Sequence, residues 1–297
     1  MAKTTKSSAR RWIKPREVRG LRGKRAIFSN NTRTHKHSGK RLGFDMMNVA
    51  RAIRTYSAYD KNYFGSQLQI DTDRAIHRFN NTRIGIRLLN DMYARASDPK
   101  RNTAFTAVGR GILHKRLAVN EEIERAAAFV ESIAVENLYM CPEIVVRNHF
   151  DNHVSYIPAH VWYIAVEILK NAVVAVVNKY QAPALEESSS STRVIPSTRP
   201  RLPPIYVDVI TNEFSTEIHT MDSGGGIDSI EHAMAYCFTT GKRPAGNDLH
   251  GAGIGLPMVK AYSEYFGGSL GIQNKSDGSR VSVRLLHDMD SFESVCD

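Results

Sequence analysis

The chain has 297 residues, of which 42% are hydrophobic, and it carries a formal net charge of +10. This hydrophobic fraction is large enough to form a folded core, which excludes a chain that is disordered throughout. The three cysteines lie far apart without CxxC spacing, so neither a zinc ribbon nor a disulfide framework is expected. The longest apolar stretch, residues 161–177, is interrupted by polar residues and is shorter than the roughly 20 residues of a membrane span, so we expect none.

The positive charge is concentrated in residues 1–43, which carry +13, whereas residues 44–297 carry −3. This basic extension has few apolar residues and no helical or strand periodicity, so we expect no core of its own. Three interpretations remain open: a mitochondrial targeting segment, an arm that contacts RNA phosphates, or a solvated tail. The candidate RNA contacts are Arg10, Arg11, Lys14, Arg16, Arg19, Arg22, Lys24 and Arg25.

Residues 44–140 are predicted to be helical. One helix over residues 73–96 carries a broad apolar stripe, and another begins near Asn120, a residue type favoured at helix N-caps. The stripe consists of Ile76, Phe79, Ile84, Ile86, Leu88, Leu89 and Met92.

Residues 141–290 are predicted to form a mixed domain, followed by a tail at residues 291–297. Alternating apolar residues indicate strands at 143–147, 154–157, 205–210, 215–221, 270–273 and 279–286. Helical periodicity indicates helices at 158–179, 231–235 and 257–266. The Pro- and Ser-rich segment 181–204 is typical of a disordered surface insertion.

Two short motifs in this domain contain candidate ligand-binding residues: the first lies within a predicted helix and the second is a glycine-rich segment after a predicted strand. In the predicted helix 158–179, Glu167 and Asn171 are four residues apart, so they share a face that could hold a cation and orient a nucleophile. Asp222 follows a predicted strand and precedes Gly224 and Gly226, where the backbone can approach a ligand closely.

Two further motifs follow along the chain. Gly251, Gly253 and Gly255 lead into the predicted helix 257–266, so free backbone N–H groups and the helix dipole would face an anion there. The spacing is GxGxG without a βαβ unit, which disfavours a dinucleotide-binding Rossmann site. Ser279 then opens the last predicted strand and supplies a hydroxyl.

Taken together and in this order, the four motifs resemble those of the Bergerat (GHKL) ATP-binding fold. The segments around Glu167, Asp222, Tyr236 and Gly251 are similar to the mitochondrial pyruvate dehydrogenase kinase family, and residues 261–270 look closest to its branched-chain ketoacid dehydrogenase kinase branch. The resemblance implies an α+β fold, with a Bergerat sandwich preceded by a shortened helical bundle and the basic arm.

The resemblance also implies roles for individual residues. Glu167 would be the general base for phosphoryl transfer to a protein serine, and Asn171 would hold magnesium. Asp222 would bind the adenine amino group together with Ser279. Other expected ATP-binding residues are Lys170, Gly224, Gly226, Thr239, Thr240, Gly251, Gly253, Gly255 and Leu256.

Three departures from the family pattern leave two functions open. Tyr163 replaces a histidine of the pyruvate branch, Val174 replaces an arginine, and the helical segment is shorter than the family's bundle. One expectation is a kinase of the mitochondrial matrix that acts on a ketoacid dehydrogenase subunit. The alternative is an ATP-binding component of a mitochondrial ribosome that contacts ribosomal RNA and proteins through residues 1–43.

Overall fold

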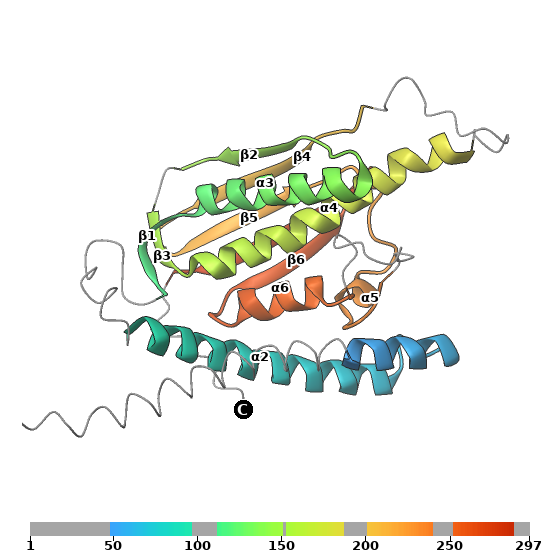
Figure 1. The fold of residues 1–297 in the computed structure, drawn as a ribbon, viewed down its shortest axis with the longest axis horizontal. Coiled ribbons are helices and arrows are strands. Elements are labelled where there is room, and N and C mark those ends of the chain that lie inside the picture. Colours follow the sequence, from blue (N-terminus) through green and yellow to red (C-terminus); the bar gives the residue numbers. More distant parts are fainter. Residues whose placement is uncertain (1–47, 97–111, 151–152, 187–200, 240–251, 288–297) are drawn as a thin grey trace, which may run out of the picture. The chain divides into compact units, whose positions relative to one another are not determined.

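A computed structural model describes residues 48–96, 112–150, 153–186, 201–239 and 252–287. Its centre is a five-stranded sheet with the strand order β2-β4-β5-β7-β6 (Figure 1). The strands of this sheet are β2 (Ile144–Asn148), β4 (Ile205–Thr211), β5 (Ser215–Met221), β6 (Ser269–Asn274) and β7 (Ser279–Leu286). β2 pairs with β4 in parallel, and the other three pairs are antiparallel.

The strands bury alternate residues, as the sequence pattern predicts for a sheet with one covered face. In β4, Ile205, Val207 and Val209 are fully buried, whereas the intervening Tyr206 and Asp208 are half-buried. The main core therefore lies between this sheet face and the helices that cover it.

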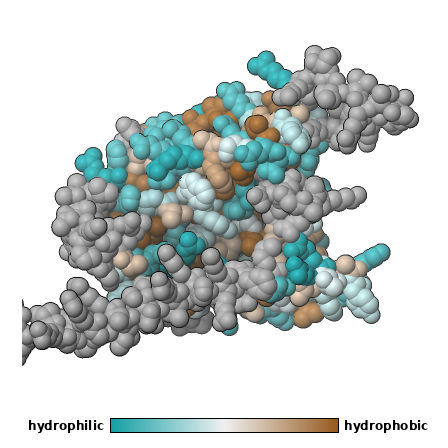
Figure 2. Space-filling model, viewed as in Figure 1, coloured by the Kyte–Doolittle hydropathy of each residue, from teal (hydrophilic) through white to brown (hydrophobic). Residues whose placement is uncertain are grey.

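Helices α3 (Val119–Leu138), α4 (Pro158–Glu186) and α6 (Gly255–Glu264) form the covering layer. They lie side by side, with α4 packed between α3 and α6 and against β5 (Figure 1). A short helix, α5 (Ile230–Met234), lies beside α6. The face of the molecule shown in Figure 2 mixes polar and apolar residues. Phe129 and Val135 of α3 are exposed apolar residues.

Residues 158–180 of α4 are long and apolar enough to cross a membrane by length and composition alone. Most of this stretch is buried in the protein, including Val161, Ile164 and Val173. A core helix passes the same test, and the packing of α4 against α3, α6 and β5 is that of a core helix.

The helix α2 (Gln67–Ala96) packs against α6, and residues 48–59 form a further helix before it. The predicted apolar stripe is wrong in part. Ile76 and Ile84 are buried, but Phe79, Ile86, Leu89 and Met92 are 42–64% exposed. The buried face instead includes Gln69 and Asn80, because contact with α6 and the chain before it, rather than hydrophobicity alone, sets the orientation of the helix.

Three other predictions are corrected. The strand β1 (His114–Ala118) lies inside the segment predicted to be helical, and it pairs with β3 (His153–Tyr156) in a separate two-stranded sheet. Helix α3 begins at Val119 rather than after Asn120, and its N-cap residue, Ala118, makes no side-chain capping hydrogen bond. Helix α4 continues to Glu186, into the segment predicted to be a disordered insertion.

The predicted α+β class is confirmed, since the structure combines a mixed sheet with helices packed over one of its faces. The domain divisions at residues 43, 140 and 290 stay predictions.

Candidate functional site

The central helix of the candidate site is α4, which begins at Pro158, a residue well suited to the first helical turn because it lacks an N–H. Glu167 and Lys170 lie on one of its faces, with Lys170 Nζ 3.2 Å from Glu167 Oε1. Their side chains are only 17% and 12% exposed. This partly buried ion pair restricts the Glu167 carboxylate, and Asn171 follows it in an exposed position.

The N-terminus of α6 approaches Glu167 closely. A β-carbon at Gly255 would lie 2.6 Å from Glu167 Oε2, so the absence of a side chain at this position permits the contact. The first turn of α6 presents free backbone N–H groups and the positive end of the helix dipole. The structure therefore places a carboxylate, an ammonium group and a helix N-terminus together.

The second part of the site lies where β5 ends and β7 begins. Ser279 Oγ donates a hydrogen bond of 2.6 Å to Asp222 Oδ2, and the Gly224 N–H donates one of 2.7 Å to Asp222 Oδ1. Each carboxylate oxygen retains a lone pair. Asp222 is half-buried and Ser279 is 6% exposed, so the carboxylate is held in a fixed orientation and can accept a further donor.

The glycine segment after Asp222 packs directly against α4. A β-carbon at Gly224 would lie 2.8 Å from the backbone carbon of Ala175, which explains glycine at this position. Gly226 has a φ of +87°, a conformation that glycine adopts without strain. Ala175 is eight residues after Glu167, or about 12 Å along the helix axis. The Asp222 and Glu167 parts of the site therefore lie along one helix.

Two residues that sequence reasoning missed hold this glycine segment in place. Asn274 accepts a hydrogen bond of 2.9 Å from Ile227 N–H and donates one of 2.8 Å to Ile227 C=O. Lys179 Nζ donates to the carbonyls of Ser223 and Asp277, each at 3.0 Å, and pairs with the Asp277 carboxylate. No local sequence signal identifies these clamps, because the partners are distant in the chain.

The structure describes only part of the third motif, the segment with Gly251, Gly253 and Gly255 that leads into α6. The Cys237 N–H donates a hydrogen bond of 2.7 Å to Gly253 C=O, and Gly253 has a φ of +74°. Thr239 is exposed and Leu256 is half-buried. Thr240 and Gly251 lie outside the described residues, as do all eight candidate RNA contacts of the basic extension.

A buried aromatic cluster borders the catalytic candidates. His160 lies 4.7 Å from Tyr262 and 5.9 Å from Phe266 between ring centroids, and Tyr163 lies 4.8 Å from Tyr262. Burial, with a smaller effect of nearby Arg87, lowers the pKa of His160 to about 3. Burial and the neighbouring Glu167 carboxylate raise the pKa of Tyr163 far above its usual value, so its hydroxyl stays protonated. The Nδ1 atom of His160 has no hydrogen-bond partner among the described residues, so this ring does not cap α4 through Nδ1.

A metal site made by protein side chains alone is not found in the described segments, where no three His, Cys, Asp or Glu residues converge. Magnesium usually needs only one or two protein ligands beside phosphate oxygens and water, so the exposed Asn171 amide beside Glu167 fits such a site. A cavity of about 340 Å³ lies elsewhere, between α2 and α6, and no predicted ATP-binding residue lines it.

The chain is similar to curated proteins that share one description. The chain is 29% identical over 289 residues to a mitochondrial pyruvate dehydrogenase (acetyl-transferring) kinase of Schizosaccharomyces pombe, covering 91% of the chain and 60% of that protein. It is 27% identical over 210 residues to the mitochondrial enzyme of the same name from Arabidopsis thaliana, covering 66% of the chain and 52% of that protein. Isozyme 4 of Homo sapiens is 28% identical over 150 residues, which covers 48% of the chain and 32% of the human protein.

The chain therefore spans about half to three fifths of the length of the first two relatives. No protein-family model matches it.

Proposed function

We propose that this chain, a homologue of the mitochondrial pyruvate dehydrogenase kinases, binds ATP and transfers its γ-phosphoryl group to a serine hydroxyl of a protein. The observation that carries the proposal is the arrangement along α4. The Asp222 loop packs at Ala175, and the Glu167 carboxylate lies about two turns away beside the N-terminus of α6. A nucleotide suits this arrangement, because its nucleobase could lie at Asp222 while its phosphates lie near Glu167 and the start of α6.

The Asp222 end would bind adenine. Its carboxylate is oriented by Ser279 Oγ and Gly224 N–H, and each oxygen can accept one further hydrogen bond. The adenine amino group would donate to it, whereas guanine presents a carbonyl oxygen at that position. Leaving a buried acceptor unpaired costs about 1–3 kcal/mol, so ATP should bind at least about tenfold more tightly than GTP.

The other end would bind the phosphates. Free N–H groups at the start of α6, with Gly253 and Gly255 before and within its first turn, suit the close approach of an anion. Lys170 supplies positive charge nearby and Asn171 would hold magnesium, which when bound neutralises phosphate charge.

Glu167 would act as the general base. Its carboxylate would accept the proton of the attacking serine hydroxyl while the serine oxygen bonds to the γ-phosphorus and the bond to the β-phosphate oxygen breaks, which releases ADP. Lys170 pairs with this carboxylate, which lies against the first residue of α6. Tyr163, whose pKa is raised by burial and by Glu167, stays neutral and adds no second negative charge.

The relatives support a location and a substrate class. Each is a mitochondrial pyruvate dehydrogenase kinase by name, and we extend this to a place in the mitochondrial matrix and to a ketoacid dehydrogenase subunit as substrate. The experiment is calorimetry with ATP and GTP in the presence of magnesium, followed by a phosphoryl-transfer assay on purified dehydrogenase subunits.

Two variants separate binding from chemistry. Asp222→Asn should weaken ATP binding by about tenfold or more, because an amide cannot replace a carboxylate toward both Ser279 and adenine. Glu167→Gln should leave ATP binding within about twofold and abolish phosphoryl transfer. Absence of ATP binding at millimolar concentration in the wild type would contradict the proposal.

A second candidate function follows from the charge of residues 1–43. With +13 in this segment, the chain could be an ATP-binding component of a mitochondrial ribosome that contacts RNA. Deletion of residues 1–43 should then remove most of the salt dependence of RNA binding, which amounts to about 0.7 in the logarithmic slope per single-strand phosphate neutralised. RNA binding that is unchanged by the deletion would exclude this function.

A further inference from the structure

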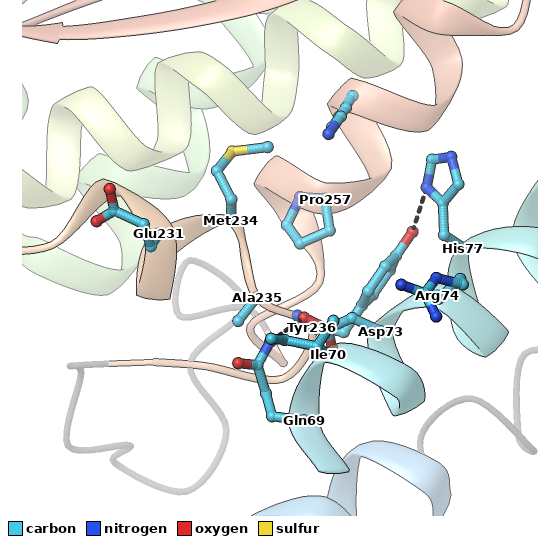
Figure 3. A pocket seen from close by; sticks show the side chains of 11 residues that line it. Gln69, Ile70, Asp73, Arg74, His77, Glu231, Met234, Ala235, Tyr236 and Pro257 are labelled. Atoms are coloured by element: carbon cyan, nitrogen blue, oxygen red, sulfur yellow. Dashed lines mark hydrogen bonds between the residues drawn. The ribbon is translucent and has the colours of Figure 1, made fainter. Parts of the chain in front are cut away.

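A cavity of about 340 Å³ lies between the first half of α2 on one side and α5, the two residues that follow it and the start of α6 on the other (Figure 3). This volume is at the lower end of the range for small-molecule pockets. The side chains of α2 face those of Met234 and Pro257 across the cavity, whereas Tyr236 lies against α2 beside Asp73 and His77. None of these residues belongs to the nucleotide site proposed above, so the inference does not rest on that function.

Two carboxylates line the cavity without a cationic partner. Asp73 accepts a hydrogen bond of 3.2 Å from the Tyr236 N–H and another from the Gln69 side-chain amide. Glu231 is exposed and accepts a hydrogen bond of 3.3 Å from Ser229 Oγ. Within the part of the chain that the structure describes, neither carboxylate forms a salt bridge.

The two cations that line the same cavity are already paired outside it. Arg74 lies 3.1 Å from Asp71, and Lys260 lies 3.9 Å from Glu264, in each case on its own helix. Neither Asp71 nor Glu264 lines the cavity. The lining side chains carry two negative and two positive charges. Both cations are paired on their own helices, whereas the negative charges of Asp73 and Glu231 have no cationic partner among the described residues.

The neutral groups of the cavity do not offset this charge. Burial lowers the pKa of His77, so the ring is neutral at pH 7, and its Nδ1 lies 3.4 Å from the Tyr236 hydroxyl. Burial also raises the pKa of the Asp73 carboxyl, because no cation compensates its loss of water. A positively charged ligand would remove this penalty.

The remaining walls are apolar or aromatic. Ile70, Met234 and Pro257 give a surface for a hydrocarbon chain, and the Tyr236 ring lies beside Asp73 (Figure 3). An aromatic face and a carboxylate together bind guanidinium and ammonium groups through cation–π and charge-assisted hydrogen bonds.

We propose that this cavity binds a guanidinium or primary ammonium group carried on an apolar stem. The head would pair with Asp73, the stem would lie along Met234 and Pro257, and Glu231 would attract the charge at the entrance. This chemistry is that of an arginine or lysine side chain of a protein partner, or of a small alkylamine.

The binding test uses three matched blocked amino acids in calorimetric titrations of the whole chain: N-acetylarginine methylamide, its neutral citrulline counterpart and the anionic glutamate counterpart. The arginine compound should bind saturably and at least about tenfold more tightly than the citrulline compound, which keeps the shape but lacks the charge. Equal binding of the two, or tighter binding of the glutamate compound, would overturn the proposal.

Charge variants test the site assignment. Asp73→Asn, which retains an acceptor for the Tyr236 N–H, should weaken arginine binding by about tenfold or more. Glu231→Gln should weaken it by about two- to fivefold, and Lys260→Gln should strengthen it by a similar factor. Glu121→Gln, an exposed carboxylate on α3, is the matched control and should change nothing.

If Asp73→Asn does not fold, the exposed positions Glu231 and Lys260 still decide, because their variants are predicted to act in opposite directions. Equal effects of both variants would overturn the assignment.

A comparison of agmatine with the blocked peptide Gly-Gly-Arg-Gly-Gly then distinguishes the two sources of the cationic group, a small amine and a protein partner. Tighter binding of the peptide indicates a protein partner, tighter binding of agmatine indicates a small amine, and failure of both to bind at millimolar concentration would overturn the proposal.

Discussion

A β-carbon at residue 255 would lie 2.6 Å from Glu167 Oε2, so the first residue of α6 must be glycine for the carboxylate to occupy its observed position. The obstructing atom is the end of a flexible side chain, which can move at little cost. Gly255→Ala should therefore displace Glu167 without unfolding the protein, and alanine's higher helix propensity should offset part of any loss of stability.

For Gly255→Ala we expect phosphoryl transfer to fall by about tenfold or more while the melting temperature stays within about 3 °C of the wild type. The measurement is a transfer assay beside a thermal melt. Gly271→Ala is the control, because a β-carbon there would meet only Ser282 C=O, at 3.9 Å. Transfer activity that is unchanged in Gly255→Ala would show that the position of Glu167 does not limit the reaction.

The hydroxyl of Ser279 should contribute to nucleotide affinity through the hydrogen bond that it donates to Asp222. Ser279→Ala removes a charge-assisted hydrogen bond from the half-buried Asp222 carboxylate, and we expect ATP affinity to fall by about fivefold to twentyfold. Ser279→Thr retains the donor and should restore most of the affinity. Calorimetry on both variants checks this, and equal affinities for alanine and threonine would be inconsistent with the role of the hydroxyl.

Asn274 should affect ATP binding from a distance. Asn274→Ala removes both hydrogen bonds to Ile227 and frees the glycine segment that packs on α4. We expect ATP affinity to fall by about threefold to tenfold through the cost of ordering this segment again on binding. Asn274→Asp keeps the acceptor for the Ile227 N–H and should lose less. Hydrogen exchange of residues 224–227 should increase in the alanine variant; unchanged exchange would contradict the clamp.

His160 should make the protein less stable at mildly acidic pH. Its pKa is about 3 in the folded state because of burial, against about 6.5 when unfolded, so below pH 6.5 the unfolded state binds a proton that the folded state does not. The free energy of unfolding should therefore fall as pH decreases from 6.5 toward 3, by about 2 kcal/mol between pH 6.5 and pH 5.

The measurement is urea unfolding at pH 7.5 and pH 5. His160→Leu should reduce the difference between the two pH values by about 2 kcal/mol, whereas the exposed His153→Gln should not. The same difference in His160→Leu and in the wild type would show that other groups cause the loss.

Most of the sheet and the order of its elements could be predicted from the sequence, because strands such as β4 alternate strictly between buried and half-buried residues. The position of α2 could not. Its most apolar stripe is exposed at Leu89 and Met92, whereas Asn80 is fully buried, so local hydrophobic periodicity gave the helix but not the face it buries.

The candidate site could likewise be predicted only where local sequence motifs mark its residues. Asp222, Glu167 and Gly255 were predicted from short motifs and their resemblance to a family, and the structure brings them to one helix. Asn274 and Lys179 were missed because their partners are 47 and up to 98 residues away, which no local pattern can show. The β1 strand was missed since its five residues become a strand only by pairing with β3.

The pairing of β5 with β7 also has a consequence for how the protein acquires its site. Asp222 and Ser279 are 57 residues apart in the chain, and they meet only when these two strands are in register. Contacts of such long sequence separation form slowly, because the intervening chain must lose much of its freedom first. Recovery of ATP binding should therefore lag behind the recovery of helical signal during refolding, so a ligand signal reports completed assembly of the sheet rather than early collapse.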